Sequence, residues 1–338
     1  MKKITLVVDT PDWAYANIAR QVQKCLGHMF EVIVLPITVV DNNPIKAILA
    51  SKDSDLVHFF WREALRTIDS PSNLSYLAGL GLNWGEFESR YLAPKKLTVS
   101  VYDHLFTSKS DLRHRSKFFH GVAGYTVSSS KLFEIYQASQ YVPDPTSLIQ
   151  DGVDLELFTP RKQTIGSSFE NEIKIGWVGN SEWGDAGDHK GLHTIVRPAL
   201  EILRNEGRPV VENFADRKLK HTPMHQMPDY YAGVDLLVCA SKNEGTPNPV
   251  LEAMACGVPV VTTDVGIVRE VFGQLQSQFI VDERSPVAFA EKIGILLDDE
   301  SAMQELSRQN RESVSAWGWD VQAKKFGQFF SSILASQS

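Results

Sequence analysis

A loop, a short helix and a short strand follow one another between residues 244 and 262. The loop is Glu-Gly-Thr-Pro, and Asn248 after it is a good N-cap, with Pro249 at the first helical position, where a missing N–H costs nothing. Gly257 is suited to end the helix. The β-branched run at 258–262 is typical of a buried parallel strand. Helix and buried strand in alternation indicate an α/β fold.

The start of this helix is predicted to bind an anion. Its first N–H groups, at Val250 and Leu251, have no partner within the helix. Thr246 and Asn248 are expected to add two more donors from the loop. Free N–H groups and the positive end of the helix dipole together suit a phosphate or a diphosphate.

A carboxylate lies on each side of the predicted anion site. Glu244 precedes the helix and Glu252 projects from its first turn. Carboxylates repel phosphate, but they accept strong hydrogen bonds from sugar hydroxyls. Two isolated glutamates are more often solvated surface residues, but their position around a helix start favours binding. A nucleotide sugar, which has both a diphosphate and hydroxylated rings, satisfies both halves of the segment.

The residues from Glu244 to Glu252 resemble the E-x7-E signature of retaining glycosyltransferases with the GT-B fold, in family 4. The resemblance implies an α/β fold with two Rossmann-like doubly wound domains facing a central cleft. It also implies retaining transfer of a sugar from a nucleotide-diphosphate sugar to an acceptor hydroxyl. Further similarity lies at residues 149–158, 227–231, 234–238 and 253–261, at Gly266 and at Glu270.

A second motif of the resembled family follows the predicted strand 173–178. Family members carry an Arg after a glycine there and a Lys before a second glycine. Lys190 matches the Lys, whereas Asn180 stands where the Arg would be. Lys190 is therefore the candidate cation for the diphosphate, because a compact ammonium suits phosphate. The donor-binding candidates are Gly179, Asn180, Lys190, Glu244, Gly245, Thr246, Asn248, Val250, Leu251 and Glu252.

The first half of the chain begins with a strand, a helix and a second strand, at 4–8, after Trp13 and at 31–35. This order is typical of a doubly wound sheet. In the resembled family the first loop usually carries a glycine pair near the ligands. Trp13 stands there in this chain, either packed in the core or stacked on a sugar.

A tripeptide after the predicted strand 97–101 supplies the other first-half candidates. The resembled family usually has a His-Asp pair there. Tyr102 replaces the histidine, Asp103 is retained and His104 comes one position late, which leaves open the side chain that meets the transferred sugar. The catalytic candidates are Glu244, Lys190 and Asp103, and the acceptor-side candidates are Trp13, Tyr102 and His104.

The domain boundary is predicted near residue 163. Residues 1–163 form the acceptor-side domain, and residues 164–319 form the donor domain. The apolar spacing from Phe326 to Leu334 predicts a helix. In the resembled fold this last helix, at 320–338, returns to the first domain.

A basic segment lies between residues 109 and 120. It is expected either to face a phosphorylated acceptor or an anionic membrane, or, more commonly for such runs, to be a solvated helix face. Its members are Lys109, Arg113, His114, Arg115, Lys117 and His120. Asp53-Ser-Asp55 spells a metal-binding D-x-D but precedes its strand, so no metal or other cofactor is expected.

The net charge of −7 argues against a nucleic-acid partner, which would require a basic excess. The three cysteines, an odd number in apolar surroundings, indicate reduced thiols. No signal peptide and no run of about 20 apolar residues is present, so we expect a cytoplasmic protein with peripheral membrane contact at most. Its expected partners are a nucleotide sugar and a glycan or lipid-linked acceptor, in assembly of a bacterial-type surface glycan. The alternatives are a sugar-nucleotide epimerase of the same fold and a binding-only relative.

Overall fold

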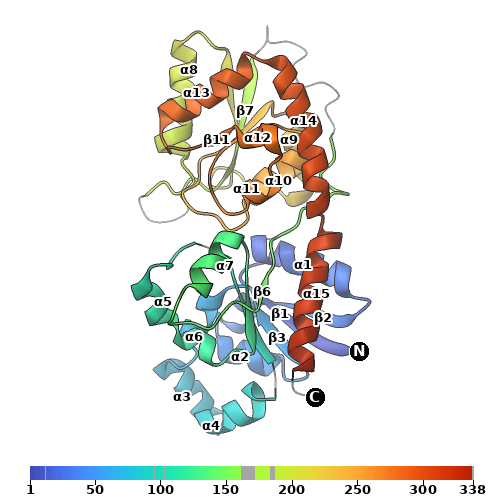
Figure 1. Ribbon diagram of the computed structural model, residues 1–338. Helices are drawn as coiled ribbons and strands as arrows, with labels where there is room; N and C mark the ends of the chain where they lie inside the picture. Colours follow the sequence, from blue (N-terminus) through green and yellow to red (C-terminus); the bar gives the residue numbers. More distant parts are fainter. Residues whose placement is uncertain (12, 95, 103, 161–171, 183–186, 337–338) are drawn as a thin grey trace. The chain divides into compact units, whose positions relative to one another are not determined.

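The computed structural model describes residues 1–11, 13–94, 96–102, 104–160, 172–182 and 187–336 (Figure 1). The chain forms two compact units. The first comprises Met1–Asp151 and Trp319–Ser338, and the second comprises Gly152–Gly318. The division falls earlier than the predicted 163, because Val153 and Phe158 are buried in a hydrophobic cluster of the second unit.

The first unit contains a six-stranded parallel sheet in the order β2-β1-β3-β4-β5-β6. Every residue of β3 is buried, as expected for a strand covered on both faces. The strands are β1 (Lys2–Val8), β2 (Phe30–Pro36), β3 (Leu56–Phe59), β4 (Lys96–Val101), β5 (Gly124–Val127) and β6 (Ser147–Leu148).

Helices cover both faces of this sheet (Figure 1). On one face α1 (Ala14–Leu26) and α15 (Trp319–Ala335) share a hydrophobic cluster with β1. The apolar stripe from Phe326 is the buried side of α15. The other face has its own cluster. Its helices are α2 (Pro44–Ala50), α3 (Pro71–Gly79), α4 (Trp84–Phe87), α5 (Lys109–Arg115), α6 (Lys117–His120) and α7 (Ser130–Gln137).

A buried histidine helps to dock α15 on the sheet. The two ring nitrogens of His58 hydrogen-bond with Thr98 and Ser100 of the neighbouring strand, each at 2.9 Å. Burial lowers the pKa of His58 to about 3, so the ring is neutral. The rings of Phe329 and Phe330 meet it edge-on. The polar ring therefore satisfies its hydrogen bonds within the sheet while presenting its edge to an aromatic helix.

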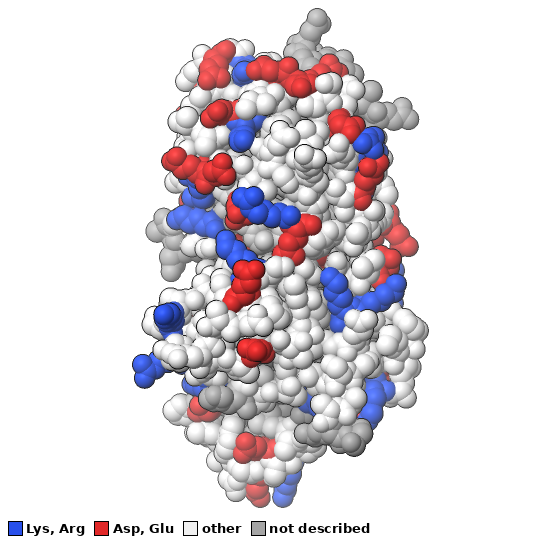
Figure 2. Space-filling model, viewed as in Figure 1, with Lys and Arg blue, Asp and Glu red and all other residues white. Residues whose placement is uncertain are grey.

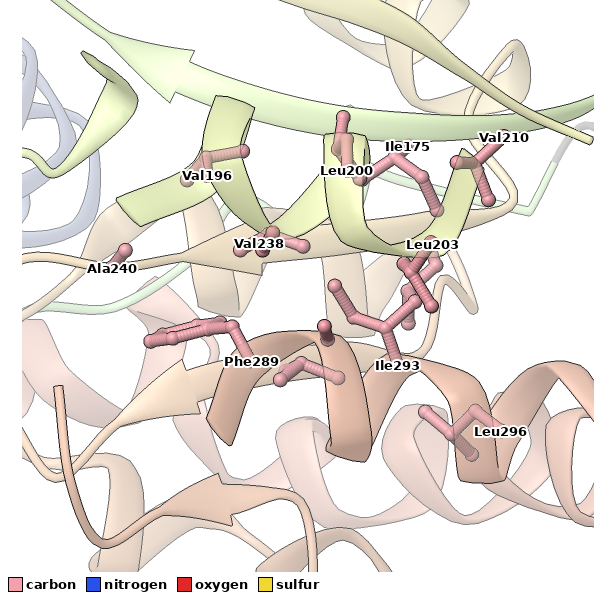
Figure 3. Close-up of a cluster of buried hydrophobic side chains, with 14 of the residues drawn as sticks. Ile175, Val196, Leu200, Leu203, Val210, Val238, Ala240, Phe289, Ile293 and Leu296 are labelled. Carbon is pink, nitrogen blue, oxygen red and sulfur yellow. The ribbon is translucent and has the colours of Figure 1, made fainter. Parts of the chain in front are cut away.

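The second unit contains a five-stranded parallel sheet in the order β11-β10-β9-β7-β8. In Figure 3, side chains of α8 (Arg197–Asn205) and α13 (Pro286–Leu297) meet over the strands. The strands are β7 (Ile173–Gly179), β8 (Val210–Asp216), β9 (Leu236–Cys239), β10 (Val260–Thr263) and β11 (Ile280–Val281). The other helices are α9 (Met227–Ala232), α10 (Asn248–Ala255), α11 (Val268–Val271), α12 (Gln274–Ser277) and α14 (Glu300–Val314).

In both sheets the first strand lies between the second and the third. In the first sheet the loop after β1 and the loop after β3 therefore leave toward opposite faces. In the second sheet the same holds for the loops after β7 and β9. Ligands of doubly wound sheets bind at this point, beyond the carboxyl ends of the strands. The prediction of two Rossmann-like doubly wound domains is confirmed, and each unit has one such point.

Candidate functional site

In the second sheet the strand order reverses between β7 and β9, which we call the reversal point. This point brings the two predicted motifs together. The loop after β7 ends at Gly191, and the loop after β9 leads to α10. The Lys190 ammonium lies 2.5 Å from Oε1 of Glu244, although the two residues are 54 positions apart. Burial alone would lower the pKa of Lys190, but the adjacent Glu244 carboxylate outweighs it and raises the pKa. Lys190 therefore remains a cation beside a carboxylate.

Backbone hydrogen bonds hold the loop around Lys190. Lys242 N–H donates to the His189 carbonyl at 2.9 Å. The indole N–H of Trp177, on β7, donates to the Lys190 carbonyl at 3.1 Å. The main chain at His189 and Lys190 is thus attached to neighbouring elements, and the Glu244 carboxylate holds the Lys190 ammonium.

Arg284, which follows β11, joins the same loops and was not predicted. Its Nε donates to the Ala240 carbonyl and its Nη2 to the Asp188 carbonyl, each at 2.8 Å. Burial lowers the pKa of Arg284, opposed by the charge of Asp188. No sequence pattern signals this role, because both partners are backbone carbonyls distant along the chain.

Two glycines allow close backbone approach at the site. Gly266 has φ +52°, and a Cβ there would lie 1.8 Å from the Gly245 carbonyl oxygen. Gly191 has φ +74°, and a Cβ there would lie 2.5 Å from the Ala240 carbonyl oxygen. The loop carrying Glu244 is therefore positioned by main chain packed directly on main chain, which only glycine permits.

The start of α10 differs from the prediction. Asn248 is the first helical residue and not the N-cap, which is Pro247. The Val250 N–H donates to the Pro247 carbonyl at 2.8 Å, so the prediction of a free N–H at Val250 was wrong. The chain turns one residue earlier than expected, and the Pro247 carbonyl closes the first turn. The Asn248 N–H donates to the Thr246 carbonyl at 2.9 Å, so the prediction of a free N–H there was also wrong. The anion-binding roles of Leu251 and of Thr246, which is buried, stay predictions.

The Asn248 side chain, freed from capping, has a polar atom with no partner. Among the described residues, none forms a hydrogen bond with its buried Oδ1. An amide oxygen in this position accepts a hydrogen bond from a hydroxyl or N–H group. Asn248 is thus a stronger candidate for contact with a ligand than the prediction of a capping role implied.

Glu252 is buried against α9, in the second turn of α10 and not in the first turn as predicted, because the helix begins at Asn248. The hydroxyl of Tyr231 donates to its Oε2 at 2.8 Å. Burial raises the pKa of Glu252 to about 7, opposed by that hydrogen bond. The carboxyl therefore changes its charge near neutral pH. Tyr231 was not predicted as its partner.

Gly179 and Asn180 lie where the prediction required, at the end of β7. The Asn180 side-chain oxygen accepts from the Glu182 N–H at 3.1 Å, and the Arg217 N–H donates to the Gly179 carbonyl at 2.8 Å. Asn180 thus shapes its own turn and contributes no charge. Lys190 remains the predicted cation for a diphosphate.

Two acceptor-side candidates of the first unit differ in exposure. Trp13 directly precedes α1 and is 42% exposed, which fits stacking better than a place in the core. Tyr102 is buried and packs against Tyr15 and Phe60, with ring centroids 5.2 and 6.1 Å away. Burial and the nearby Asp151 raise the pKa of Tyr102. Tyr102 therefore serves the core, and its contact with an acceptor stays a prediction.

The other two candidates follow β4. A ring nitrogen of His104 hydrogen-bonds with the Ser129 hydroxyl at 3.1 Å. Ser129 also caps α7 by accepting from the Leu132 N–H. His104 is thereby held at the carboxyl edge of the sheet. Asp103 lies outside the described residues, and its role stays a prediction.

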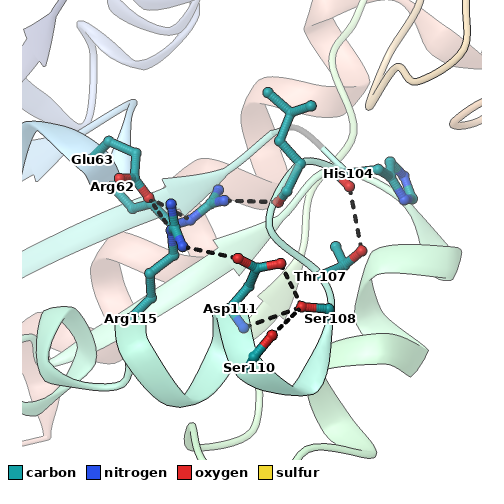
Figure 4. Close-up of polar contacts among 9 residues, drawn as sticks. Arg62, Glu63, His104, Thr107, Ser108, Ser110, Asp111 and Arg115 are labelled. Carbon is teal, nitrogen blue, oxygen red and sulfur yellow. Dashed lines mark hydrogen bonds and ion pairs between the residues drawn. The ribbon is translucent and has the colours of Figure 1, made fainter.

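A buried ion network holds the loop after β4 (Figure 4). Arg62 is fully buried, and its Nη2 donates to the Leu105 carbonyl at 3.2 Å. Arg115, on α5, donates from Nε to Glu63 Oε1 at 2.8 Å. The Arg115 guanidinium also lies 3.6 Å from the ring centroid of Phe106, a residue with φ +59°. Charges from the 3-10 helix after β3 (Arg62–Thr67) and from α5 thus fix the loop that follows His104.

The described residues contain no group of three or more His, Cys, Asp or Glu that could hold a metal ion. In the D-x-D sequence, Asp55 accepts from the Lys2 ammonium at 2.7 Å and from the Lys3 N–H at 2.8 Å. Asp55 is thus used at the start of β1, away from the carboxyl edge. Within the described ranges, no helix has both the length and the apolar character that crossing a membrane requires.

Comparison with known families identifies the site region. Residues 217–313 match the model of the family described as glycosyl transferases group 1. The span includes Glu244, Glu252, Gly266 and Arg284, but not Lys190. The match thus falls within the second unit and spans the loop after β9 and α10.

Two similar proteins are glycosyltransferases by name. A D-inositol 3-phosphate glycosyltransferase of Xylanimonas cellulosilytica is 34% identical over 60% of this chain and 54% of its own length. A putative teichuronic acid biosynthesis glycosyltransferase, TuaC of Bacillus subtilis, is 38% identical over 58% of this chain and 51% of its own length. The chain thus matches about half the length of these relatives.

Solved structures resemble the whole chain. Anabaena HepE in complex with UDP-glucose aligns with a TM-score of 0.70 at 14% identity, covering 98% of this chain and all of HepE. Sucrose-phosphate synthase from Thermosynechococcus elongatus aligns with a TM-score of 0.68 at 16% identity over the full length of both chains. At such identities the likeness concerns the fold, which is the two-domain GT-B fold.

Proposed function

We propose that this chain moves a glycosyl group, with retention, from a nucleotide-diphosphate sugar to an acceptor hydroxyl. The observation that carries the proposal is the Lys190–Glu244 pair at the reversal point of the second sheet. It sets a cation suited to phosphate beside a carboxylate suited to sugar hydroxyls. The group 1 match across residues 217–313 and the names of the relatives support the same activity.

In the proposed mechanism the donor site stabilises the leaving diphosphate. Lys190 faces the charge that develops on it, in a position set before the reaction begins. Glu244 orients the hydroxyls of the transferred sugar, and Glu252 accepts from the ribose hydroxyls. No pair of carboxylates in the proposal acts as nucleophile and acid, so departure and attack take place on the same face of the sugar. Asp103 is the candidate for contact with the sugar or the acceptor.

We propose chemical classes for the donor and for the acceptor. The HepE structures contain UDP-glucose in one case and UDP with glucose in another, which makes a UDP-sugar the first donor to try. The names of the relatives refer to an inositol phosphate and to a teichuronic acid. A polyhydroxylated acceptor in glycan assembly, either soluble or lipid-linked, is therefore proposed. No metal is assigned, because Lys190 supplies the positive charge.

A donor and acceptor screen tests the proposal. The full chain is incubated with nucleotide sugars, with and without glycan acceptors and with and without EDTA. Release of nucleoside diphosphate that requires acceptor and survives EDTA is expected. An altered sugar on the nucleotide would indicate an epimerase, and binding without chemistry a binding-only relative; either result overturns the proposal.

Two lysine variants test whether the activity found in the screen depends on Lys190. Lys190→Ala is expected to lower kcat/KM roughly 10–100-fold, as for loss of a hydrogen bond to a charged group. Lys174→Ala, an exposed lysine at the other end of β7, is the matched control and should be unaffected. Near-normal kinetics of Lys190→Ala would show that another group faces the diphosphate.

A further inference from the structure

The short helix α5 separates its charges between two sides. On the inner side, Arg115 is paired with Glu63 at 2.8 Å and with Asp111 at 3.4 Å. The other oxygen of Asp111 accepts from the Ser108 hydroxyl at 2.5 Å, and Leu112 is buried. The only acidic residue of α5 is therefore engaged with groups of its own helix and cap (Figure 4).

The outer side of α5 carries only basic and neutral groups. Lys109, Arg113 and His114 are exposed there. In the part of the chain that the structure describes, no carboxylate forms an ion pair with Lys109 or Arg113. In Figure 2, which shares the view of Figure 1, blue side chains project at the left edge, where Figure 1 labels α5. Within the described ranges, the outward charge of this helix is thus not compensated by an ion pair.

These cations line a hollow of about 600 Å³. The lining residues are Lys109, Ser110, Arg113, His114 and Tyr141. Four of them come from α5, and Tyr141 comes from the segment after α7. The hollow therefore combines an ammonium, a guanidinium, an imidazole and two hydroxyls, all of which donate hydrogen bonds when protonated. All five residues belong to the first unit, whereas the proposed donor-site residues belong to the second.

The arrangement costs helix stability unless an anion binds. Lys109 and Arg113 are four positions apart, and like charges at this spacing destabilise a helix. Lys109 also stands in the first turn, where the helix dipole disfavours a cation. The inner network fixes α5 through Arg115, so the helix cannot easily turn the outer side away. A bound dianion would relieve both costs.

We propose that the hollow formed by α5 and Tyr141 binds a phosphate group, as a phosphomonoester. Arg113 is suited to bidentate contact with phosphate oxygens, and Lys109 to contact as a point charge. His114 and the Tyr141 hydroxyl complete the donor set. The phosphate belongs either to a small soluble molecule or to the headgroup of an anionic lipid. The site stands independently of glycosyl transfer, because it uses no residue of the donor site.

Histidine-ring NMR of the full chain provides a local test with inorganic phosphate as the probe. His114→Gln identifies the His114 signal among those of the nine histidines. Titration with phosphate should shift that signal saturably in the wild type and in Lys190→Ala, which removes the donor-site cation. In the double variant Lys109→Gln/Arg113→Gln the apparent Kd should rise at least about tenfold. The control Lys131→Gln/Lys324→Gln removes two exposed lysines elsewhere in the first unit and should behave as wild type.

Vesicle sedimentation separates the two phosphate sources. Vesicles of phosphatidylcholine with phosphatidic acid are compared with pure phosphatidylcholine. Sedimentation that is lost in Lys109→Gln/Arg113→Gln but kept in the control indicates a lipid headgroup. A saturable His114 shift without such sedimentation indicates a soluble phosphate. If the double variant and the control match the wild type with both probes, the site does not bind phosphate and the proposal is wrong, whatever the outcome of the donor screen.

Discussion

The loop after β9 in the second unit and the loop after β4 in the first are held in place by different means. Main chain packs on main chain in the second unit, where Gly266 meets the Gly245 carbonyl. In the first unit charged side chains hold the loop, with Arg62 and Arg115 on either side of Glu63. A glycine that permits such an approach stands in the local sequence, whereas an ion network joins residues about fifty positions apart. The first kind of support is therefore visible in a sequence motif, and the second is not.

Removal of the Glu63 charge should have the largest effect on stability. Glu63→Gln removes the carboxylate that pairs with both Arg62 and Arg115, and breaking a buried ion pair from one side costs about 3–5 kcal/mol. Asp69→Asn is the control, because its pair with Lys117 is exposed and worth about 0–1 kcal/mol. Chemical denaturation of both variants measures the difference. Equal losses would show that the network does not hold the loop.

A methyl group at Gly266 tests the main-chain support. Gly266→Ala places Cβ on the Gly245 carbonyl, and overpacking of this kind costs about 1–3 kcal/mol beyond the strain of a positive φ. Displacement of Glu244 by about 1 Å should lower turnover about 100-fold. Gly207→Ala is the matched control, since Gly207 has φ +82° with nothing within 4 Å of a Cβ. If both variants lose the same stability and activity, the contact with Gly245 is not the cause.

The buried carboxyl of Glu252 should make stability depend on pH. Its pKa is raised to about 7 from an ordinary 4.5, so the folded protein holds a proton that the unfolded chain releases. The associated stability is complete below about pH 4.5 and is lost as the pH rises through about 7, by up to about 3 kcal/mol. Glu252→Gln should therefore gain stability relative to wild type between pH 5 and 8. For exposed Glu291→Gln the difference in stability from wild type should be the same at every pH. If the difference for Glu252→Gln is also independent of pH, the Glu252 carboxyl is solvated in the folded protein.

Nucleotide binding distinguishes the two glutamates at the smallest expected scale. Glu252→Gln should weaken binding of the nucleoside diphosphate and of the donor by ~1–3 kcal/mol, through a lost charged hydrogen bond to ribose. Glu244→Gln releases Lys190 from its carboxylate, so affinity for the diphosphate should be kept or increased while turnover falls strongly. Calorimetric titration of both variants measures this. Equal weakening of the bare nucleotide in the two variants would contradict the assigned roles.

Much of the fold was predictable because buried parallel strands and helix caps both have local sequence patterns. The strand predicted at 4–8 is the core of β1, and the strand predicted at 31–35 lies within β2. Ser285 caps α13 through its side chain, and Pro286 opens it, both visible in the sequence. The helix α14 was missed, although its N-cap, Asp299, is of the expected type. Its mostly polar sequence contains few apolar residues, and packing against α10, α12 and α13 decides the helix.

A residue of the candidate site was predictable where it stands in a motif of neighbouring residues. Glu244 and Lys190 each stand in a local motif, and the reversal of strand order after β7 brings them to 2.5 Å. The free N–H at Val250 was mispredicted because the carbonyl of Pro247 competes for it, which depends on the φ and ψ angles of one loop residue. Arg284 was missed because its partners are main-chain carbonyls, which leave no trace in a side-chain pattern.

By itself the sequence determined the alternation of strands and helices, the carboxylates around the start of α10 and the basic character of α5. These features follow from hydrophobic periodicity and residue chemistry, which act over a few neighbouring residues. Only the tertiary structure decided that Tyr231 meets Glu252, that Arg115 turns inward to Glu63 and that Lys109 and Arg113 remain outside over a hollow. Burial and pairing depend on groups brought together by the fold, and such encounters set the charge and position of each side chain.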